Sequence, residues 1–292
     1  PALHSWETLA RGRTGDTLWD TAQRSLLMHG ELHNNVRMTW GKALLNWTPD
    51  AQSALAMMID LNHRYALDGR DPASYGGILW CLGQFDRPFP PARPIVGTVR
   101  DRSTSEHVKR LDTGRYLEHT TRPLYKSQPR VAIIGAGISG LLCARTLQDH
   151  GLSVKVFEKS RGVGGRMATR RAADGQRFDH GAQYFTVRDE RFERYMRAWT
   201  QDGIVAEWKG PIVTLTSGQT EPKESSTKRF VAVPSMNAIC KHLASELDIK
   251  LDVRVIGLER SSEIWLLQQD DRTSLGEFDY VITSAPAAQS GD

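Results

Sequence analysis

Cysteine is scarce in this chain of 292 residues, which has Cys81, Cys143 and Cys240 and no others. They form no CxxC pair and no His/Cys cluster, so neither a disulfide framework nor a zinc site is expected. Long apolar runs are also missing, because no stretch reaches the roughly 18 apolar residues that would predict a membrane-spanning helix. No signal-peptide pattern is visible. These absences predict a protein of the reducing cytoplasm that neither spans a membrane nor is exported.

Neither sign of charge dominates, since 38 Lys and Arg stand against 34 Asp and Glu and leave a net charge of +4. Such mild basicity suits an anionic partner such as DNA or a dinucleotide, although most surface charge is merely solvated. The length and the hydrophobic share of 39% suit about two domains with sizeable cores. The first residue is Pro1 rather than Met, so we expect a fragment of a longer protein.

The clearest motif begins with the apolar, β-branched run 131–134, which is typical of a strand buried on both faces. Gly135, Gly137 and Gly140 follow in a GxGxxG pattern that leads into a helical apolar pattern. The first glycine permits a tight turn, the second lets the backbone approach a pyrophosphate, and the third lets the helix pack on the strand. The start of the helix also offers free N–H groups and a positive dipole end to phosphates.

A second strand over 153–157 ends at Glu158, where an acid is expected to meet a ribose hydroxyl. A glycine-rich turn alone can be purely structural. Here strand, turn, helix, strand and acid occur in order, so the pattern predicts a dinucleotide site.

A second glycine cluster, 162–166, follows Glu158, and a plain NAD domain does not require it. The strings KSRGVGGRMATRR and DHGAQYFT resemble the renalase-like branch of amine-oxidase-type flavoproteins, over residues 130–292. The resemblance implies FAD in preference to NAD. It places Gly164, Gly165 and Arg166 along the pyrophosphate and flavin. The other residues that it places at the cofactor are Gly181, Ala182 and Gln183 near the isoalloxazine and Val255 at the adenine.

This resemblance implies an α/β Rossmann-type FAD-binding domain with the start of an inserted substrate domain. It also implies hydride transfer to flavin from a small-molecule substrate, an amine or a reduced-nicotinamide-like carbon, with oxygen as final acceptor. His180 beside the glycine turn is a candidate acid or base, although a lone histidine there is more often structural. Relatives of this branch continue beyond the last residue of this sequence.

The first 114 residues have helical periodicity and no βαβ pattern. Helices are expected over 17–28, 32–47, 49–65 (with Thr48 as N-cap and Pro49 first), 74–82 and 106–111. The polar stretch 115–129 has two prolines and no clear periodicity, so it is predicted to be a linker. We therefore expect an all-α segment over 1–114, the linker over 115–129 and the α/β domain over 130–292. Within the last, strands are expected over 204–215 and 250–256, and a helix is expected from Pro234 to Leu247.

The helix expected over 32–47 has an ordinary core stripe that includes Trp40 and Trp47. A neighbouring face carries Asn34, Arg37, Met38 and Gly41, and polar heads of this kind are costly to bury without partners. Either Asp68 or Asp71 offers a carboxylate to Arg37. On the pattern alone, a structural salt bridge is the simplest interpretation.

The strings HGELHNNVRMTWGKALLNW, DLNHRYALDGRDPASYGGILW and ARPIVGTVR resemble the end of the FAD-binding helical domain of class II DNA photolyases. The resemblance implies that Asn34 and Arg37 lie beside a folded FAD, and that Arg37 pairs with Asp68. Asp71 would lie at the flavin's polar edge. Asn62 is the better candidate neighbour of flavin N5, because Ser74 stands where an asparagine is commoner.

The same resemblance places Trp40, Trp19 and Trp47 on an electron-transfer chain, with Trp40 nearest the flavin and Trp47 nearest solvent. For any one of these tryptophans alone, core packing is the simpler interpretation. Photolyases carry an antenna domain and further helices ahead of this segment, and this sequence has neither. The helical segment therefore resembles only part of a photolyase.

The favoured interpretation is an FAD-dependent oxidoreductase carried with a partial photolyase module and truncated at both ends. Light-driven repair of pyrimidine dimers, with DNA contact through the helical segment, is the alternative. A flavin photoreceptor without catalysis is a third.

Overall fold

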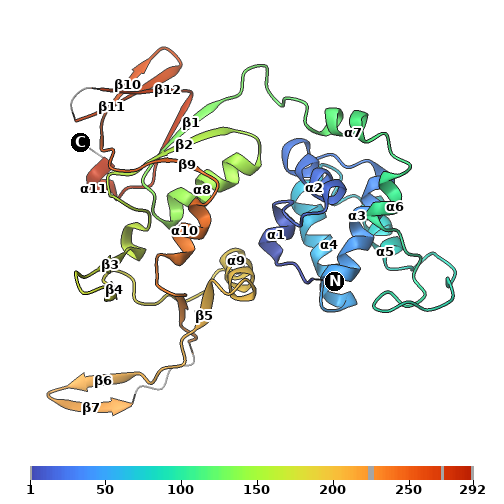
Figure 1. Ribbon diagram of the computed structural model, residues 1–292, viewed down its shortest axis with the longest axis horizontal. Coiled ribbons are helices and arrows are strands. Elements are labelled where there is room, and N and C mark those ends of the chain that lie inside the picture. Colours follow the sequence, from blue (N-terminus) through green and yellow to red (C-terminus); the bar gives the residue numbers. More distant parts are fainter. Residues whose placement is uncertain (1, 223–226, 271–272, 291–292) are drawn as a thin grey trace. The chain divides into compact units, whose positions relative to one another are not determined.

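The computed structural model describes residues 2–222, 227–270 and 273–290. The chain divides into two compact units, Pro1–Lys126 and Ser127–Asp292. Figure 1 shows helices α1 to α7 in the first, here called the helical unit, and the strands in the second, the sheet unit.

The helical unit is built from seven helices over its described residues. They are α1 (Trp6–Ala10), α2 (Thr17–His29), α3 (Asn34–Trp47), α4 (Ala51–Tyr65), α5 (Pro72–Cys81), α6 (Thr104–Val108) and α7 (Thr113–Thr120). Within the described part of this unit, β-type pairing is limited to an isolated bridge between Arg93 and Gly97. The helices expected from the sequence are thus present, with shifted ends.

Side-chain caps decide where these helices begin. Asp16 accepts a hydrogen bond from Trp19 N at the start of α2, which ends at Gly30 in the left-handed conformation with φ 68°. Helix α4 is capped by Asp50, whose carboxylate accepts from Ser53 N at 2.7 Å. The expected cap at Thr48 is wrong, because its hydroxyl instead donates to Leu44 O at 2.7 Å and closes the end of α3.

Helix α3 lies at the centre of the helical unit and contacts α2, α4 and α5. Its core residues Trp40 and Leu44 pack with Trp19 and Met58, and all four are at most 2% exposed. A Cβ atom on Gly41 would lie 2.6 Å from Cys81 Sγ, so glycine allows α5 to approach α3 closely. The stripe read from the sequence is therefore the core-facing side of α3.

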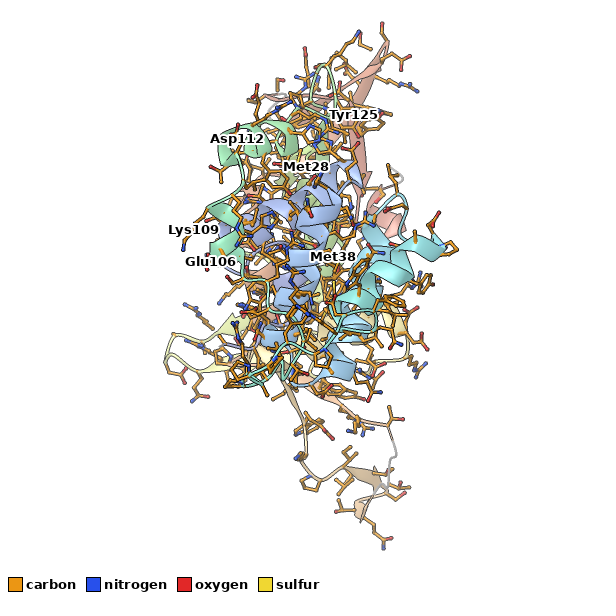
Figure 2. The ribbon with its side chains drawn as sticks, turned by 90° about the vertical axis from the view of Figure 1, so that its right-hand side faces the viewer. Met28, Met38, Glu106, Lys109, Asp112 and Tyr125 are labelled. Carbon is orange, nitrogen blue, oxygen red and sulfur yellow. The ribbon has the colours of Figure 1, made fainter. Side chains whose placement is uncertain are left out.

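The segment 115–129, predicted to be an irregular linker, is helical up to Thr120 and lies outside helices and strands over 121–129. Asp112 caps α7 through Arg115 N at 3.0 Å, and α7 packs on α2. Beyond the helix, Arg122 pairs with Glu31 at 2.8 Å. Figure 2 shows Asp112 just ahead of α7, with Glu106 on α6 and Lys109 just after that helix. Pro123 follows shortly after the end of α7, and the helical unit extends to Lys126.

The sheet unit contains a four-stranded sheet in the order β13-β1-β2-β9, and all of its pairs are parallel. Its strands are β1 (Arg130–Ile134), β2 (Ser153–Phe157), β9 (Asp248–Lys250) and β13 (Tyr280–Thr283). The register pairs Ile133 with Val156 on one side and with Ile282 on the other. This is a mixed α/β unit with a parallel sheet.

Helices and smaller sheets complete this unit. The helices are α8 (Ile138–Asp149), η1 (Gly165–Met167), α9 (Glu190–Gln201), α10 (Ala238–Ala244) and α11 (Ala287–Ser290). The antiparallel strands are β3 (Thr169–Arg171) with β4 (Arg177–Asp179), β5 (Val205–Glu207) with β8 (Phe230–Ala232), β6 (Val213–Thr216) with β7 (Gln219–Pro222), and β10 (Val255–Ser261) with β11 (Ile264–Gln269) and β12 (Ser274–Phe278). No helix of the described chain is both long and apolar enough to cross a membrane.

Strand β1 is covered on both faces, as its continuous apolar run predicted. Val131 and Ile133 join the core cluster that contains Leu141 of α8. Ala132, which points the other way, joins the cluster of Phe157 and Phe278. The strand is therefore held in the middle of the unit, and its carboxyl end carries the glycine-rich loop.

The second half of the sheet unit differs in detail from expectation. A strand expected over 204–215 is two strands, β5 and β6, which belong to different sheets because Gly210 and Pro211 interrupt it. The single strand expected over 250–256 is not formed. These residues instead contain the end of β9 and the start of β10, and Asp252 between the two strands has φ 56°. The helix expected from Pro234 is only the short α10.

Candidate functional site

The glycine-rich loop after β1 is fixed by hydrogen bonds to its neighbours. Gly135 has φ +105° and donates its N–H to Phe157 O at 2.8 Å. Ser284, just after β13, donates its hydroxyl to Ile134 O and Gly135 O, both at 3.1 Å. A Cβ atom on Gly135 would lie 2.6 Å from Ser284 Oγ. Both the backbone angle and the neighbour therefore require glycine here.

The other two glycines of the motif differ in their surroundings. A Cβ atom on Gly140 would lie 2.1 Å from Gly135 O, so this glycine sets the close approach of α8 to the loop. A Cβ atom on Gly137 would meet nothing within 4 Å. Gly137 is also the N-cap of α8, and no side chain caps that helix. The first N–H groups of α8 thus lack a capping side chain beside an open position, which suits an anion.

Glu158 lies against this loop rather than pointing into solvent. It is 7% exposed, and its Oε2 atom accepts from Ala136 N at 2.7 Å. Its Oε1 atom accepts from Ser160 N at 2.9 Å. A carboxylate has about four lone-pair sites, so capacity remains for further donors. The acid predicted at the ribose is held at the edge of the glycine loop.

The second glycine cluster lies on the first. Gly164 N donates to Ala136 O at 2.9 Å, and Gly137 and Gly164 form a parallel bridge. Ala182 N donates to Arg166 O at 2.7 Å, and a Cβ atom on Gly181 would lie 2.1 Å from that oxygen. The structure therefore brings three separate motifs of the sequence into one contiguous surface.

Some of the other residues predicted for the site in this unit also lie near the glycine-rich loop. Val253 N donates to Glu158 O at 3.0 Å, and Val255 packs half-buried beside Phe157. The position predicted to contact adenine thus borders the end of β2. Gly165 lies in the same turn, and a Cβ atom on it would come 3.4 Å from Gly137 Cα. Gln183 is exposed.

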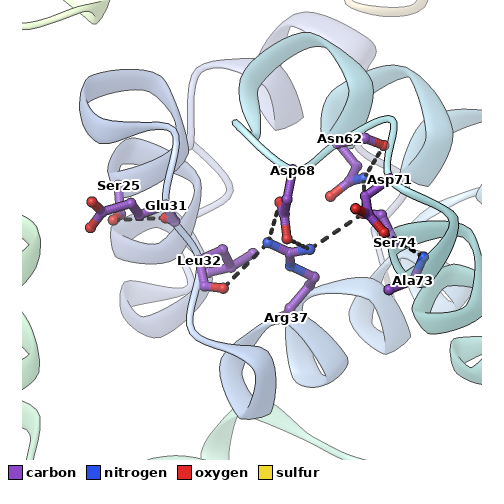
Figure 3. A network of polar contacts seen from close by, with 10 residues as sticks. Ser25, Glu31, Leu32, Arg37, Asn62, Asp68, Asp71, Ala73 and Ser74 are labelled. Atoms are coloured by element: carbon purple, nitrogen blue, oxygen red, sulfur yellow. Dashed lines mark hydrogen bonds and ion pairs between the residues drawn. The ribbon is translucent and has the colours of Figure 1, made fainter.

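In the helical unit, Arg37 and Asp68 form a bidentate ion pair (Figure 3). The Nη1–Oδ2 and Nη2–Oδ1 distances are both 2.8 Å. The hydrogen bond from Arg37 lowers the pKa of Asp68 below its ordinary value. The Arg37 side chain is 16% exposed and that of Asp68 is 55% exposed, so the pair lies at the surface of the unit. This is the pairing that the sequence led us to expect.

Ser74 connects that pair to Asn62 (Figure 3). Arg37 Nη1 donates to Ser74 Oγ at 3.3 Å, and Asn62 Nδ2 donates to the same oxygen at 2.7 Å. Asn62 Oδ1 is buried and finds no hydrogen-bond donor among the residues described. Asp71 is exposed and caps α5 by accepting from Ala73 N at 2.8 Å.

The polar face of α3 opens onto two different hollows, contrary to the single face expected. Arg37 and Asp68 line one of about 580 Å³, together with Tyr116 and His119 of α7. Asn34 and Met38 line the other, of about 1340 Å³, and Gly41 is covered by Cys81. Because α5 packs against this side of α3, the four residues do not line one cavity.

The larger hollow has a basic and aromatic lining that the sequence reading missed. Its arginines are Arg93, Arg100, Arg102 and Arg110, and its large aromatic side chains are Trp80, Phe85 and Phe89. Lys42 also lines it, and its Nζ donates to Cys81 O at 3.2 Å while burial lowers the pKa of the amine. The signal in the sequence was the run of arginines between 93 and 110, directly after the aromatic stretch 80–89.

The three tryptophans named from the sequence are in ring contact. Trp19 stacks on Trp40 at a centroid distance of 5.8 Å and an interplanar angle of 6°. Trp19 also meets Trp47 edge-on, at 5.4 Å and 73°. The order of ring contacts is therefore Trp40, Trp19, Trp47. Trp40 and Trp19 are fully buried, whereas Trp47 is half-buried.

Gln23 is a further residue of this cluster, and no motif in the sequence predicted it. The ring N–H of Trp40 donates to Gln23 Oε1 at 3.0 Å, and the ring N–H of Trp19 donates to Trp40 O at 2.9 Å.

No group of three or more His, Cys, Asp or Glu side chains in the described ranges is arranged to hold a metal ion.

Comparison with known proteins adds two kinds of relative. Residues 133–199 match the model of the NAD(P)-binding Rossmann-like domain. The deoxyribodipyrimidine photo-lyase of Oryza sativa subsp. japonica is 33% identical over 131 residues, which are 44% of this chain and 26% of that protein. Renalase of Mus musculus is 28% identical over 172 residues, which are 55% of this chain and 48% of that protein.

A solved structure of a redesigned putrescine oxidase aligns with a TM-score of 0.45 and 16% identity, over 56% of this chain and 59% of that one. The chain thus spans about a quarter of the photolyase and about half of the renalase. It shares sequence with photolyases and with renalase, and it contains a Rossmann-like segment.

Proposed function

We propose that the sheet unit binds FAD and belongs to an oxidoreductase that removes hydride from a small molecule. The observation that carries this proposal is the contiguous glycine surface formed by residues 135–137, 164–166 and 181–182. A single Rossmann loop would serve NAD(P) equally well. The second and third segments extend the surface beyond the first loop, which suits the longer contact of FAD with its protein.

The residues present fit the cofactor. The space beside Gly137 and the uncapped start of α8 suit a pyrophosphate, because backbone N–H groups and the helix dipole both favour negative charge. Glu158 would hold the adenosine ribose, and Val255 would border the adenine. Arg166 and the segment 181–183 would lie along the isoalloxazine. When bound, FAD supplies the hydride acceptor, and the protein positions it.

The substrate class proposed is an amine or a reduced-nicotinamide-like carbon, with oxygen as final acceptor. The resemblance to renalase supports this choice. NAD(P) as the bound dinucleotide is the rival, because the Rossmann-like match alone does not separate the two.

Calorimetric titration of the chain with FAD and with NAD tests the proposal. Gly137→Val should weaken FAD binding by at least about tenfold, because a side chain would occupy the space that the pyrophosphate needs. Gly114→Val is the matched control, since a Cβ atom there meets nothing nearer than 3.7 Å. Equal FAD affinity in both variants, or tighter binding of NAD than of FAD, would contradict the proposal.

We further propose that the helical unit is the light-driven part of a photolyase-like protein, active in dimer repair or in photoreception. The ring contacts of Trp40, Trp19 and Trp47 support electron hopping, and the arginine-lined hollow supports contact with DNA. The photolyase relatives support the same conclusion.

Binding of dimer-containing DNA at several salt concentrations tests this second candidate. Arg100, which lies over the Phe89 ring at 5.5 Å, should contribute one phosphate contact. Arg100→Ala should then reduce the slope of log K against log salt by about 1. Arg191→Ala, in the sheet unit, should leave the slope unchanged. Loss of dimers on illumination of the flavin-loaded protein then separates repair from photoreception.

A further inference from the structure

The three tryptophans differ in what their ring N–H groups contact. Those of Trp19 and Trp40 donate to amide oxygens, Trp40 O and Gln23 Oε1. Both rings are at most 2% exposed. Amide oxygens accept hydrogen bonds but are very weak bases. If either ring loses an electron, its proton therefore has nowhere to go, and the positive charge stays mobile.

Trp47 is different in each respect. It is half-buried, and none of the described residues accepts a hydrogen bond from its ring N–H. It meets Trp19 at a centroid distance of 5.4 Å, and it meets His4 at 5.1 Å with an interplanar angle of 87°. A neutral imidazole is a base near neutral pH, which an amide oxygen is not. The outermost tryptophan thus has a proton acceptor beside it.

We propose that His4 accepts the ring N–H proton of oxidised Trp47 and so fixes the positive charge at that end of the chain. The proposal rests on the photochemical function given above, and it takes a photoexcited flavin as the one-electron oxidant of the chain. One electron leaves the chain for the oxidant, and the electron deficiency moves through Trp40 and Trp19 to Trp47. The N–H bond of Trp47 then breaks, and the proton passes to His4 directly or through one water.

The products of this step are a neutral indolyl radical at Trp47 and an imidazolium at His4. The return of an electron then requires the return of a proton as well, so the separated state lasts longer. His4 is already tied to this place by its main chain, because His4 N donates to Trp47 O at 3.1 Å. Substitution of the side chain keeps that bond, so the fold of the N-terminal segment should survive.

The test uses the flavin-free chain and an external photo-oxidant, a ruthenium polypyridyl complex with a sacrificial electron acceptor. Trp6, Trp80, Trp199, Trp208 and Trp265 are replaced by phenylalanine, so that Trp19, Trp40 and Trp47 are the tryptophans left to give the signal. After a laser flash, the cation radical and the neutral radical of tryptophan are followed by their different absorption bands. Trp47→Phe in the same background should abolish the neutral radical and so identify its source.

His4→Ala should slow the conversion of cation radical to neutral radical by about tenfold or more, and added imidazole should restore it. His63→Ala is the matched control, because His63 meets Tyr75 at 4.9 Å and 68° and has no ring contact with the tryptophans among those described. Equal rates in the two variants would overturn the proposal. A slower rate that imidazole does not rescue would overturn it too, since that would show a structural effect.

These outcomes are independent of flavin binding, because the oxidant is supplied from outside. If the complete protein shows no photoreduction while His4→Ala still slows the conversion, the photochemical function is wrong and the role of His4 stands. If photoreduction occurs and His4→Ala changes nothing, the photochemical function stands and the role of His4 is wrong.

Discussion

Gln23 ties the tryptophans to the rest of the helical unit. Its Nε2 atom donates to Ala10 O at 3.0 Å, and its Oε1 atom accepts from the ring of Trp40. The side chain is fully buried, so removal of its polar atoms leaves a donor and an acceptor without partners. Methionine has nearly the same shape and neither hydrogen bond, so Gln23→Met isolates this effect.

Gln23→Met should lower the free energy of unfolding by about 1–3 kcal/mol, measured by urea denaturation with tryptophan fluorescence. Gln52→Met is the control, because Gln52 is exposed on α4 and should change stability by less than about 0.5 kcal/mol. A fall no larger than that of the control would show that the contact with Trp40 contributes little.

Asp68 gives a prediction that depends on pH. Its folded-state pKa is lowered by Arg37, so the pair stabilises the fold above the ordinary aspartate pKa of about 3.9 and is lost as pH falls through the lower folded value. The carboxylate is more than half exposed, so the contribution is about 0.2–1 kcal/mol. Asp68→Asn should therefore be less stable than the parent at pH 7. The two should become equally stable at low pH, and a constant difference would exclude the ion pair as the cause.

At this scale the sequence anticipated residues that belong to a recognisable pattern. Arg37, Asp68 and the tryptophans stand in strings that resemble a known family, and the structure places them in contact. Gln23, His4 and Ser284 were missed, because what marks each of them is a contact with a residue distant in sequence. No periodicity or spacing marks such a contact before the chain is folded.

Among the elements, α8 and its glycine-rich loop contain one glycine that is needed for packing and another that is needed for binding. A Cβ atom on Gly140 would overlap Gly135 O, whereas one on Gly137 would meet open space. Gly140→Ala should therefore lower stability by about 1–3 kcal/mol through overpacking. Gly137→Ala should change stability by less than about 0.5 kcal/mol and still weaken FAD binding. Thermal unfolding and FAD titration of both variants check this, and equal destabilisation by both would contradict the proposed cradle.

In helix α7 we expect a substitution that does not lower stability, unlike those above. Burial raises the pKa of Tyr116 to about 12, and none of the residues described is a hydrogen-bond partner of its hydroxyl. Removal of that hydroxyl costs no hydrogen bond, so Tyr116→Phe should keep or raise stability. Tyr116→Ala should lower it, because the ring packs on the helical core. A loss in Tyr116→Phe, seen by denaturation, would reveal a partner for the hydroxyl.

Elements were predicted better than their ends. Strong periodicity gave α2, α3 and α4, whereas α7 was taken for a linker because its few apolar residues are diluted by polar ones. Its stability comes from a cap at Asp112 and from docking on α2, and docking has no local signal. The cap of α4 was misplaced for a related reason, since Thr48 and Asp50 are both good N-caps and only the end of α3 decides between them.

At the scale of the whole molecule, the division into units follows from the two separate buried clusters of apolar side chains. The helical unit has its own core around Trp19, Trp40 and Leu44, and the sheet unit has clusters on both sides of β1. The sequence showed the same division as a change from helical periodicity to a strand–turn–helix pattern. It could not show where the first unit ends, because α7 binds back onto α2.

The last prediction concerns the independence of these units. Because the contacts of the chain cluster within Pro1–Lys126 and within Ser127–Asp292, calorimetry should resolve two unfolding transitions. Gln23→Met should lower the midpoint of one transition only, and Gly140→Ala that of the other only. In the double variant the two losses should add to within about 0.5 kcal/mol, as they do for sites without shared partners. FAD should then raise the transition that Gly140→Ala lowers, since a ligand stabilises the unit that binds it. A single transition that both substitutions lower would mean that the units unfold together. In that case the binding of a ligand to one unit would change the stability of the other.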